Sequence, residues 1–545
     1  MKKRLFCLVI ALVCLIMPVL TSCGGDDEYK PYSSVKAITI TLYGIKGEGT
    51  TDEAVKAVQD ALNVYSEGKL NTRVLLRLFT EDEYYEKLNE AFDAAQKYKD
   101  DKKNNKNDKN DSEDKPAGTG DKDQKFEMEY PAEQGTQVDI FMVRGSEMFE
   151  KYNTEGYTVA LNLSDKSGLT KKYISERYLA LTSVNGTPTS GGLLEKQKLH
   201  GVINNTVSGE YTYLLVNKVI ADNYGYAANN LDTLSELQYF LDDAASDYSD
   251  YITLYNAPVV DTATIEGSLL GGVINENSHA YSKLAPSSLL EDSAYVEYSK
   301  YLNLFESKNY ITEGSYYSLP EGKVAAAFLK GNAALAEKYS EDYIVVPYAK
   351  PVMEDIGTVF CVSKYAANAA RCLEIISLLQ TNVDYRNTFQ YGVENVHYTI
   401  NEYTGMLNIV SNEYNMNPAD TGNLFILKEN SSMDEATKAL AANNWELAKQ
   451  QYRDTVISPY TLFNLDLTGL NVESFKAVSD SYKEQLMSYV PGSEKTFEEH
   501  ASELNGLFKE TNEYKIFAEP SESGEGTPVS IGTQYITWCE KQKIA

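Results

Sequence analysis

Cysteine is scarce in this chain, and its distribution excludes a disulfide framework. The sequence has only 6 cysteines among 545 residues. Apart from those in the N-terminal segment, they are odd in number and have no short spacing, so they match neither a disulfide-rich scaffold nor a zinc site. Cys361 and Cys372 could pair, but the pattern favours small buried thiols. The cysteines outside the N-terminal segment are Cys361, Cys372 and Cys539.

Histidine and catalytic motifs are also rare. The stretch Gly44–Gly49 lies between a predicted strand and a predicted helix but lacks the Gly-Lys-Ser/Thr of a phosphate loop. No Gly-x-Ser-x-Gly element is present, so a serine hydrolase is unsupported. We therefore expect a protein that is not an enzyme and uses no cofactor and no metal. The 4 histidines, none in a His-x-x-x-His pair, are His200, His279, His397 and His500.

Positive charge is in deficit. Lys and Arg number 50 against 79 Asp and Glu, which gives a net charge of −29 at pH 7. Nucleic acids and anionic lipid surfaces need a basic partner, so the composition argues against both. The excess of acid favours neutral or cationic ligands. Tyrosine, by contrast, is abundant at 42 residues, and its flat ring and hydroxyl suit sugars as well as half-exposed surfaces.

The N-terminus predicts export from the cytoplasm. Lys2–Arg4 carry positive charge, and the apolar run Leu5–Val19 is shorter than a membrane span and contains Pro18. The following Leu20–Cys23 resembles a bacterial lipobox, in which the cysteine is acylated. We expect a signal peptide over 1–22, a lipid anchor at Cys23 and a flexible tether over 23–36, so that the protein works outside the cytoplasm on a membrane. An ordinary cleaved signal is the alternative.

Strands and helices alternate after the tether. Ile38–Leu42 and Arg73–Phe79 alternate as strands do, and each is followed by a capping box, Thr50-x-x-Glu53 and Thr80-x-x-Glu83. Strand, helix, strand, helix with short connections is typical of an α/β lobe with a mostly parallel sheet. Residues 99–125 lack large apolar side chains, and they are predicted to be a disordered surface insertion.

The same pattern continues beyond the insertion. Two more capping motifs follow, Thr233-x-x-Glu236 before the helix around Phe240 and Thr381-x-x-Asp384 before a helix that stops at Gly392, and the C-terminal part is predicted to be mostly helical. The further predicted strands are Val138–Val143, Tyr211–Val216, Ile252–Tyr255 and Tyr343–Pro347, and the further helices surround Phe240, Leu302 and Leu373.

Several short motifs resemble those of one family. The most specific runs from Arg386 to Tyr398 and contains Tyr391-Gly392-Val393-Glu394-Asn395-Val396-His397-Tyr398. Asn395 stands where the family pattern usually has Gly, and Asn tolerates left-handed backbone geometry. Together with the lipobox, these motifs resemble extracellular solute-binding lipoproteins of ABC transporters, maltose-binding-protein-like and closest to a Gram-positive oligosaccharide-binding branch. The other matching segments are Val138–Phe141, Gly156–Leu163, Gly331–Ala334, Ile344–Pro347, Gly422–Phe425 and Gln534–Trp538.

The resemblance implies a fold and its divisions. It implies an α/β, two-lobe periplasmic-binding-protein type II fold, with hinge strands and a ligand cleft between the lobes. The crossings are expected near Asn204–Ser208, near Asp355 and near Asn412. The implied parts are 37–208 (lobe one, first part), 209–354 (lobe two, first part), 355–412 (lobe one, second part) and 413–545 (lobe two, C-terminal helical part).

The resemblance also implies where the ligand binds. Ligand residues should lie at the ends of strands that face the cleft, as in other open α/β sheets. From lobe one the candidates are Tyr43, Lys46 and Glu48 in the first strand-to-helix loop and Arg144, Ser146 and Glu147 in the third. From lobe two they are Tyr213, Asn256, Asn332 and Trp445.

Each candidate has a structural alternative. Tyr43 can pack under its loop, Arg144 can form a surface ion pair, and Trp445 can pack a helix instead of stacking on a pyranose. Trp538 is assigned to packing, and His397 with Tyr398 to a structural turn after Gly392.

The implied function is that of a lipid-anchored receptor, a monomer that captures a small solute, an oligosaccharide by resemblance, and delivers it to ABC permease subunits. Two other functions stay open: an extracellular glycan-acting hydrolase with a carboxylate pair, and a surface glycan-binding protein without a transporter.

Overall fold

The structure is a computed structural model that describes residues 37–107, 137–161, 174, 176–184, 198–231, 233–275, 285–403, 405–428, 445–463, 465–519 and 529–541. The predicted signal peptide, the tether, Cys23 and residues 108–125 of the predicted insertion lie outside this part of the chain. Within it, every helix is too short or too polar to cross a membrane.

Five strands form the sheet of the first lobe, in the spatial order β2-β1-β3-β16-β6. β1 pairs parallel with β2 and β3, while β16 runs antiparallel to β3 and β6. The predicted strands at Ile38–Leu42, Arg73–Phe79 and Val138–Val143 are therefore confirmed, with small shifts at their ends. The strands are β1 (Ile38–Ile45), β2 (Thr72–Phe79), β3 (Ile140–Arg144), β6 (Val202–Ile203) and β16 (Thr358–Val362).

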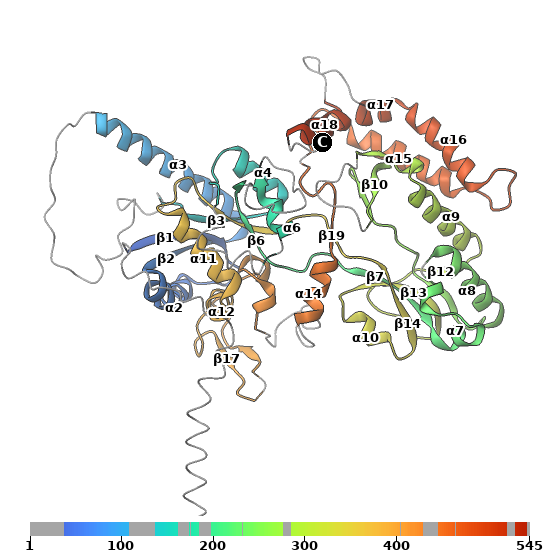
Figure 1. The fold of residues 1–545 in the computed structure, drawn as a ribbon, viewed down its shortest axis with the longest axis horizontal. Helices are drawn as coiled ribbons and strands as arrows, with labels where there is room; N and C mark the ends of the chain where they lie inside the picture. The colour runs from blue at the N-terminus through green and yellow to red at the C-terminus, as the bar shows by residue number, and fades with distance from the viewer. Residues whose placement is uncertain are drawn as a thin grey trace, which may run out of the picture.

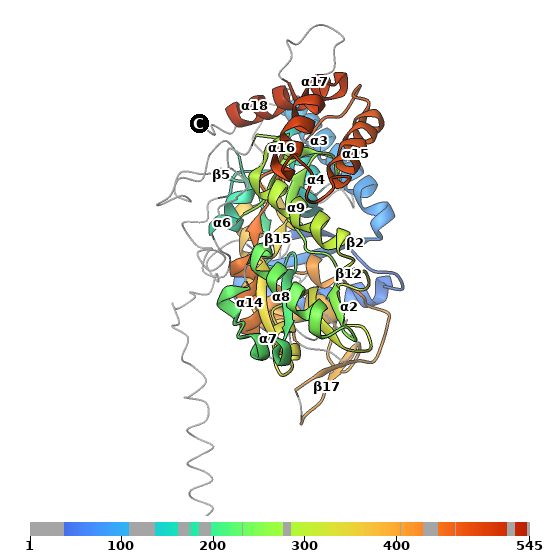
Figure 2. The ribbon, with the colours of Figure 1, turned by 90° about the vertical axis from the view of Figure 1, so that its right-hand side faces the viewer.

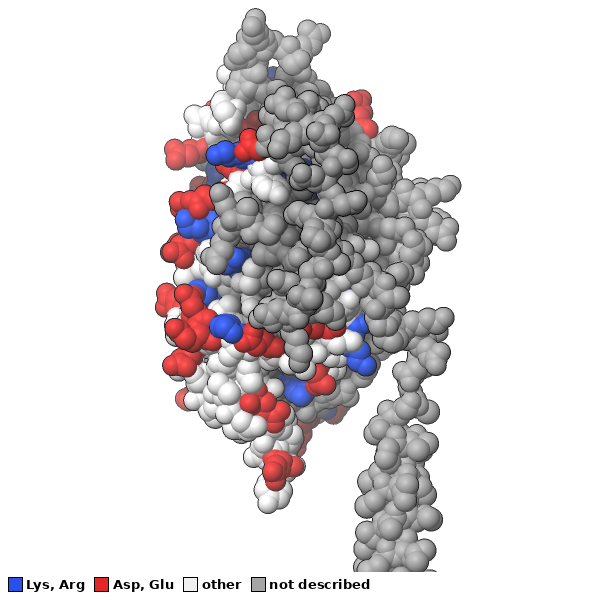
Figure 3. Space-filling model, turned by 90° about the vertical axis from the view of Figure 1, so that its left-hand side faces the viewer, with Lys and Arg blue, Asp and Glu red and all other residues white. Residues whose placement is uncertain are grey.

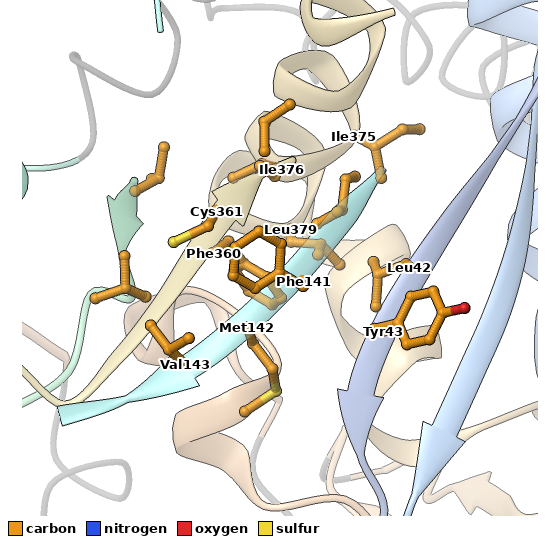
Figure 4. Packing of buried hydrophobic residues seen from close by; sticks show 14 of the residues in the cluster. Leu42, Tyr43, Phe141, Met142, Val143, Phe360, Cys361, Ile375, Ile376 and Leu379 are labelled. Atoms are coloured by element: carbon orange, nitrogen blue, oxygen red, sulfur yellow. The ribbon is translucent and has the colours of Figure 1, made fainter. Parts of the chain in front are cut away.

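Helices pack on this sheet and bury a large apolar core. Figure 4 shows Ile376 and Leu379 of one of these helices lying over Phe360 of β16. Cys361 and Cys372 are free and buried, as the preferred reading of their spacing predicts, and burial raises the pKa of both thiols. The helices are α2 (Asp52–Leu70), α3 (Glu81–Asn107), α4 (Gly145–Thr154), α11 (Ala369–Thr381) and α12 (Val383–Tyr391).

A buried carboxylate joins the strands of this core. Asp139 accepts hydrogen bonds from the Thr41 backbone N–H at 2.7 Å and from the Ala367 N–H at 2.6 Å. The Thr41 hydroxyl donates to it as well, at 3.1 Å. Burial raises the pKa of Asp139 despite these donors. The aspartate of the family-like motif therefore has a structural role.

The second lobe contains a second five-stranded sheet, in the order β12-β8-β13-β7-β14. β13 pairs parallel with β8 and antiparallel with β7, and β14 is antiparallel to β7. Helices α8 (Leu234–Asp247) and α9 (Ser293–Ser307) bury one face of the sheet. The strands are β7 (Tyr211–Asn217), β8 (Ile252–Tyr255), β12 (Ile311–Thr312), β13 (Val324–Gly331) and β14 (Tyr343–Ala349).

The C-terminal helices belong to the second lobe. They lie beside α9, at the top of the view in Figure 2. Their core is rich in aromatic rings: Phe475 stacks on Phe517 with 4.3 Å between ring centroids, and Trp538 lies 5.6 Å from Phe463. The packing role assigned to Trp538 is confirmed. The helices are α15 (Val472–Met487), α16 (Phe497–Lys509), α17 (Asn512–Ala518) and α18 (Ile531–Lys541).

The remaining short elements are α6 (Glu176–Leu179), α7 (Lys218–Tyr224), α10 (Leu335–Tyr339), α14 (Trp445–Asp454), β4 (Ser183–Val184), β5 (Lys198–Leu199), β9 (Thr262–Thr264), β10 (Leu270–Val273), β11 (Ser287–Ser288), β15 (Val352–Met353), β17 (Tyr398–Ile400), β18 (Leu407–Ile409) and β19 (Val456–Ile457).

Two lobes stand side by side in Figure 1, joined by extended segments in the middle of the molecule. The chain leaves the first sheet after Ile203 and enters the second at Tyr211; it returns between Met353 and Thr358. Acidic side chains predominate over basic ones among the described residues of the face in Figure 3, in keeping with the net charge of −29.

The last crossing differs from the expected position near Asn412. Tyr414, Met416 and Phe425 are buried in the core of the first lobe, although 413–428 was assigned to lobe two. Ile457 still belongs to that core, whereas Phe463 packs with the C-terminal helices. The chain therefore passes to the second lobe between these two residues, because the apolar side chains after Asn412 fit the first core.

Two predicted capping boxes are off by one residue. α2 is capped by Thr51, whose hydroxyl accepts from Ala54 N–H, while Thr50 donates to the carbonyl of Asn415. α12 is capped by Asn382 rather than by Thr381. In both places the neighbouring residue has the side-chain oxygen in position, and the predicted threonine bonds elsewhere.

The predicted disordered insertion begins too early. α3 continues through Asn107, and Lys99 Nζ donates to the Lys364 carbonyl at 3.0 Å and lies 4.8 Å from the Tyr365 ring. The segment 99–107 contains several lysines, which are good helix formers, and it extends a helix that is already nucleated, so it needs no large apolar side chains to continue that helix.

Candidate ligand-binding pocket

The topology brings carboxyl ends of strands from both sheets to the junction of the lobes. The carboxyl ends of β1, β2 and β3 lie at one edge, because the three strands are parallel. Thr358 at the start of β16 pairs with Arg144 at that edge, so the returning segment enters there. In the second sheet, Tyr211 pairs with Gly331, which places the ends of β8, β13 and β14 at the edge where β7 begins. The two edges are those joined by the crossings.

A pocket of about 390 Å³ lies at this junction. Its wall in the first lobe is the start of α4, and its floor comes from the segment that returns from the second lobe and from the last crossing. Three of the predicted ligand residues, Arg144, Ser146 and Glu147, line it together. The other lining residues are Gly145, Met148, Glu150, Glu354, Asp355, Thr461 and Phe463.

The start of α4 is held by a carboxylate from the other side of the pocket. The Ser146 backbone N–H and hydroxyl both donate to Asp355 Oδ1 at 2.7 Å. A carboxylate at a helix N-terminus satisfies orphan N–H groups and complements the helix dipole. Gly145 has a φ of 83°, and a Cβ there would lie 2.9 Å from Asp355 Oδ2. The pocket wall therefore needs glycine at this position.

Arg144 is the positively charged residue of the pocket wall, and its charge is already paired. Its Nε donates to Asp420 Oδ1 at 3.2 Å and its Nη2 to Asp420 Oδ2. Its Nη1 lies 2.6 Å from Glu81 Oε1. Asp420 is buried and also accepts from the Thr358 hydroxyl at 2.6 Å. Arg144 therefore forms ion pairs, as its structural alternative predicts, and it also lines the pocket.

The first strand-to-helix loop lies at the same edge but does not line the pocket. Lys46 forms an ion pair with Asp52 at 3.4 Å, and Glu48 is exposed. Gly47 N–H donates to the Asn415 carbonyl at 2.8 Å, which holds the loop against the segment after β18. Tyr43 is buried in the core, where its ring stacks on Phe79 with 6.1 Å between centroids. Burial raises the pKa of Tyr43 to about 12.

The predicted residues of the second lobe occupy its hinge-facing edge with mostly structural contacts. Asn256, with a φ of 62°, donates to the carbonyls of Ser315 and Phe328 and accepts from Gly314 N–H. Tyr213 is buried, with its hydroxyl 3.4 Å from the Asn332 carbonyl. The Asn332 side chain accepts from Ala334 N–H at 2.9 Å. The side chain of Trp445 lies outside the described residues.

The end of α14 lies between the lobes. Tyr452 stacks on Tyr178 of the first lobe with 4.2 Å between ring centroids. Toward the second lobe, Asp454 accepts from the Tyr211 hydroxyl at 2.6 Å, and Gln451 donates to the Gly209 carbonyl at 2.8 Å. On the first-lobe side the Tyr178 hydroxyl also donates to the Tyr452 carbonyl at 3.0 Å, so α14 is bonded to both lobes.

Sequence reasoning missed a group of half-buried tyrosines in the second lobe. The Tyr348 ring lies 4.9 Å from Phe328, and the Tyr316 hydroxyl donates to the Ala257 carbonyl at 3.1 Å, at the end of β8. Tyr298 on α9 belongs to the same packed group. The abundance of tyrosine was a signal for such a surface, but it could not say which tyrosines meet.

A carboxylate connects these tyrosines electrostatically with the pocket. Burial raises the pKa of Asp261; the positive charge of Lys330 opposes this shift and the negative charge of Glu354, which lines the pocket, adds to it. The negative charge of Asp261 in turn adds to the effect of burial in raising the pKa of Tyr348. Among the described residues, no group of three or more His, Cys, Asp or Glu side chains has the arrangement of a metal site.

Comparisons with known proteins give similarities in structure only. No family model matches the chain, and no curated protein sequence does. The N-glycan transport solute-binding protein of Streptococcus pneumoniae is 14% identical, with 93% of this chain and 99% of that chain covered and a TM-score of 0.48. An extracellular solute-binding protein family 1 structure from Alicyclobacillus acidocaldarius is 12% identical, with coverage of 88% and 99% and a TM-score of 0.43.

A third similar structure is the extracellular solute-binding protein of Staphylococcus aureus in complex with maltose. It is 12% identical, with 87% of this chain and 97% of that chain covered and a TM-score of 0.38. All three are solute-binding proteins, and this chain is similar to them along most of its length.

Proposed function

We propose that this protein is an extracytoplasmic solute-binding receptor whose ligand binds in the pocket at the junction of the two lobes. The observation that carries the proposal is the pocket itself. It joins the carboxyl end of a parallel sheet to the segments that cross between the lobes. Open α/β sheets bind ligands at such edges, and a ligand that touches both lobes stabilises their closed arrangement.

We propose that the solute is an oligosaccharide, following the motif resemblance in the sequence. Hydroxyl groups of a sugar can bond to carboxylates such as Glu147 and Glu354, and an apolar ring face can pack on Phe463. Micromolar affinity corresponds to about 8 kcal/mol, which exceeds an opening preference of a few kcal/mol.

The decisive experiment is a thermal-shift panel of neutral oligosaccharides, peptides and polar metabolites, followed by small-angle scattering of the best ligand's complex. Binding raises Tm, and closure lowers the radius of gyration. Glu147→Gln should weaken that binding about tenfold, one charge-assisted hydrogen bond being lost. The matched control is Glu484→Gln on the exposed side of α15, which leaves affinity unchanged.

Three outcomes would contradict the proposal. The first is that no member of the panel raises Tm; the second is that Glu147→Gln and Glu484→Gln behave alike. The third is the release of reducing ends from the glycans, which would instead support the hydrolase.

We further propose that acylation of Cys23 anchors the protein and that it delivers its solute to an ABC permease. The lipobox-like sequence supports the anchor, and more than one acyl chain gives stable membrane binding. Cys23→Ser should move the protein from the membrane fraction to the medium without changing solute affinity. Deletion of the gene should abolish uptake of the identified solute; normal uptake would favour the surface glycan-binding alternative.

A further inference from the structure

The guanidinium of Arg144 has few donors left for a ligand. An arginine has five N–H donors in a fixed fork. In Arg144, Nε and one N–H of Nη2 are used by Asp420, and one N–H of Nη1 faces Glu81. The Arg144 side chain is 27% exposed. It can therefore still offer an N–H to a hydroxyl or carbonyl oxygen of a solute in the pocket.

Breaking the ion pair between Arg144 and Asp420 is unfavourable in free energy. The Asp420 side chain is only 1% exposed, and its other side-chain donor is the neutral Thr358 hydroxyl at 2.6 Å. If a solute carboxylate or phosphate took the guanidinium, a buried charge would lose its counterion, which is strongly unfavourable.

Hydrogen bonds to backbone carbonyls on both sides of Asp420 hold its loop in place. Arg386 Nη2 donates to the Pro418 carbonyl at 3.1 Å and Nε to the Asn423 carbonyl at 3.1 Å. Asn204 Nδ2 donates to the Ala419 carbonyl at 2.7 Å. The carboxylate is therefore presented to Arg144 by a loop with bonds on both sides, so the pairing does not depend on a mobile surface side chain.

The other charges of the pocket have the same sign. Glu147, Glu150, Glu354 and Asp355 line it, and Arg144 is the one cation among the described lining residues. A solute therefore meets an arginine whose charge is cancelled, surrounded by carboxylates.

We infer that Asp420 is a specificity-determining positioning residue: it converts Arg144 from an anion-binding group into a hydrogen-bond donor for uncharged solutes. The pocket thus accepts neutral or amine-bearing solutes and rejects carboxylated, sulfated and phosphorylated ones. This inference rests on the proposed function only in taking the pocket as the ligand site.

The test needs no knowledge of the solute, because inorganic sulfate serves as the anionic probe. Tm is measured in sodium sulfate and in sodium chloride of equal ionic strength for the wild type, Asp420→Asn, Arg144→Gln and the double variant. Sulfate stabilises most proteins non-specifically. The sulfate-induced rise in Tm of each protein is therefore compared with the rise shown by the double variant. Asp420→Asn should gain a sulfate-dependent rise of about 1 to 2 °C over the double variant, and the wild type should show none.

Two results would overturn the inference. One is a sulfate-dependent rise in the wild type that Arg144→Gln removes, since Arg144 would then bind anions with Asp420 present. The other is a folded Asp420→Asn variant with no rise. A purely structural role for Asp420 would lower Tm equally in both salts.

If Asp420→Asn does not fold, Glu81→Gln provides a second test, because Glu81 is 70% exposed and its loss leaves the pair between Arg144 and Asp420 intact. The readout is again Tm in sulfate and in chloride of equal ionic strength, and the reference is the double variant Glu81→Gln with Arg144→Gln. Glu81→Gln should show no sulfate-dependent rise over this reference, because Asp420 still cancels the charge of Arg144. A rise would overturn the inference, since Glu81 and not Asp420 would then keep anions away from Arg144. Failure of the solute panel would refute the proposed function but leave these results intact.

Discussion

The two lobes use different chemistry to hold the segments that pack beside their sheets. In the first lobe, buried polar side chains bond the segment after β18 to the core, as Arg386 and Asn387 do through backbone carbonyls of 418–426. In the second lobe, stacked aromatic rings such as Phe475 and Phe517 fix the C-terminal helices. Hydrogen bonds demand particular atoms at particular angles, whereas ring packing depends on volume and shape. The first lobe should therefore be less tolerant of conservative substitution.

The largest effect is expected at Arg386, which is fully buried and, among the described residues, donates to neutral acceptors. Arg386→Lys should lower the free energy of unfolding by about 3 kcal/mol or more, because an ammonium cannot reproduce the fork and leaves buried carbonyls unpaired. Urea denaturation followed by circular dichroism measures this loss. A loss as small as that of an exposed substitution would contradict the comparison.

A smaller effect is expected for the conservative change in the second lobe. Phe475→Leu should lower the free energy of unfolding by about 1 to 1.5 kcal/mol, because leucine fills most of the space beside Phe517. The same urea experiment gives the value. The comparison between the lobes fails if Phe475→Leu costs more than Arg386→Lys.

The stability of the first lobe should also depend on pH through His397. This histidine is buried, and its Nδ1 accepts from Val393 N–H at 2.9 Å. Burial lowers the pKa of His397 below its usual value, although the charge of Glu413 opposes the shift. The unfolded state therefore binds the proton more tightly, so the contribution is complete above about pH 6.5 and is lost as the pH falls below it.

The urea midpoint of the wild type should accordingly drop between about pH 7.5 and 5.5 more steeply than that of His397→Gln. Parallel pH profiles of the two proteins would show that His397 does not titrate as its surroundings imply.

The smallest effect is expected at Tyr43. Because the ring packs in the core of the first lobe, Tyr43→Phe should change the free energy of unfolding by less than about 1 kcal/mol and leave solute affinity unchanged. Isothermal titration with the solute identified by the panel checks this point. A clear loss of affinity would restore the ligand role that the sequence predicts.

Local patterns predicted most elements of the fold. Alternation identified β1 and β2, the predicted strand at Tyr343–Pro347 corresponds to β14, and the Thr233 cap of α8 was correctly placed. The errors arose where a distant segment competes: Asn415 takes the hydroxyl of Thr50, so Thr51 caps α2. Such long-range partners leave no trace in local sequence.

The candidate site was predicted only in part for the same reason. A charge directly after an apolar strand indicated Arg144, and Ser146 and Glu147 follow it into the pocket. Asp355 and Asp420 were missed, because they reach Arg144 and Ser146 from segments more than 200 residues away. The expectation that ligand residues lie at the ends of strands identifies an edge of each sheet. It cannot show that the side chains of Tyr213 and Asn256 point into their own lobe.

The position of β16 has a consequence for biosynthesis. This strand lies between β3 and β6, yet it is translated after the whole first part of the second lobe. A growing chain that has emerged as far as Met353 therefore carries an incomplete first sheet, with β3 and β6 unpaired on the sides that β16 will fill. Exposed strand edges of this kind invite aggregation. The interval before residues 358–362 join the sheet is therefore the one in which the first lobe is most open to pairing with other chains.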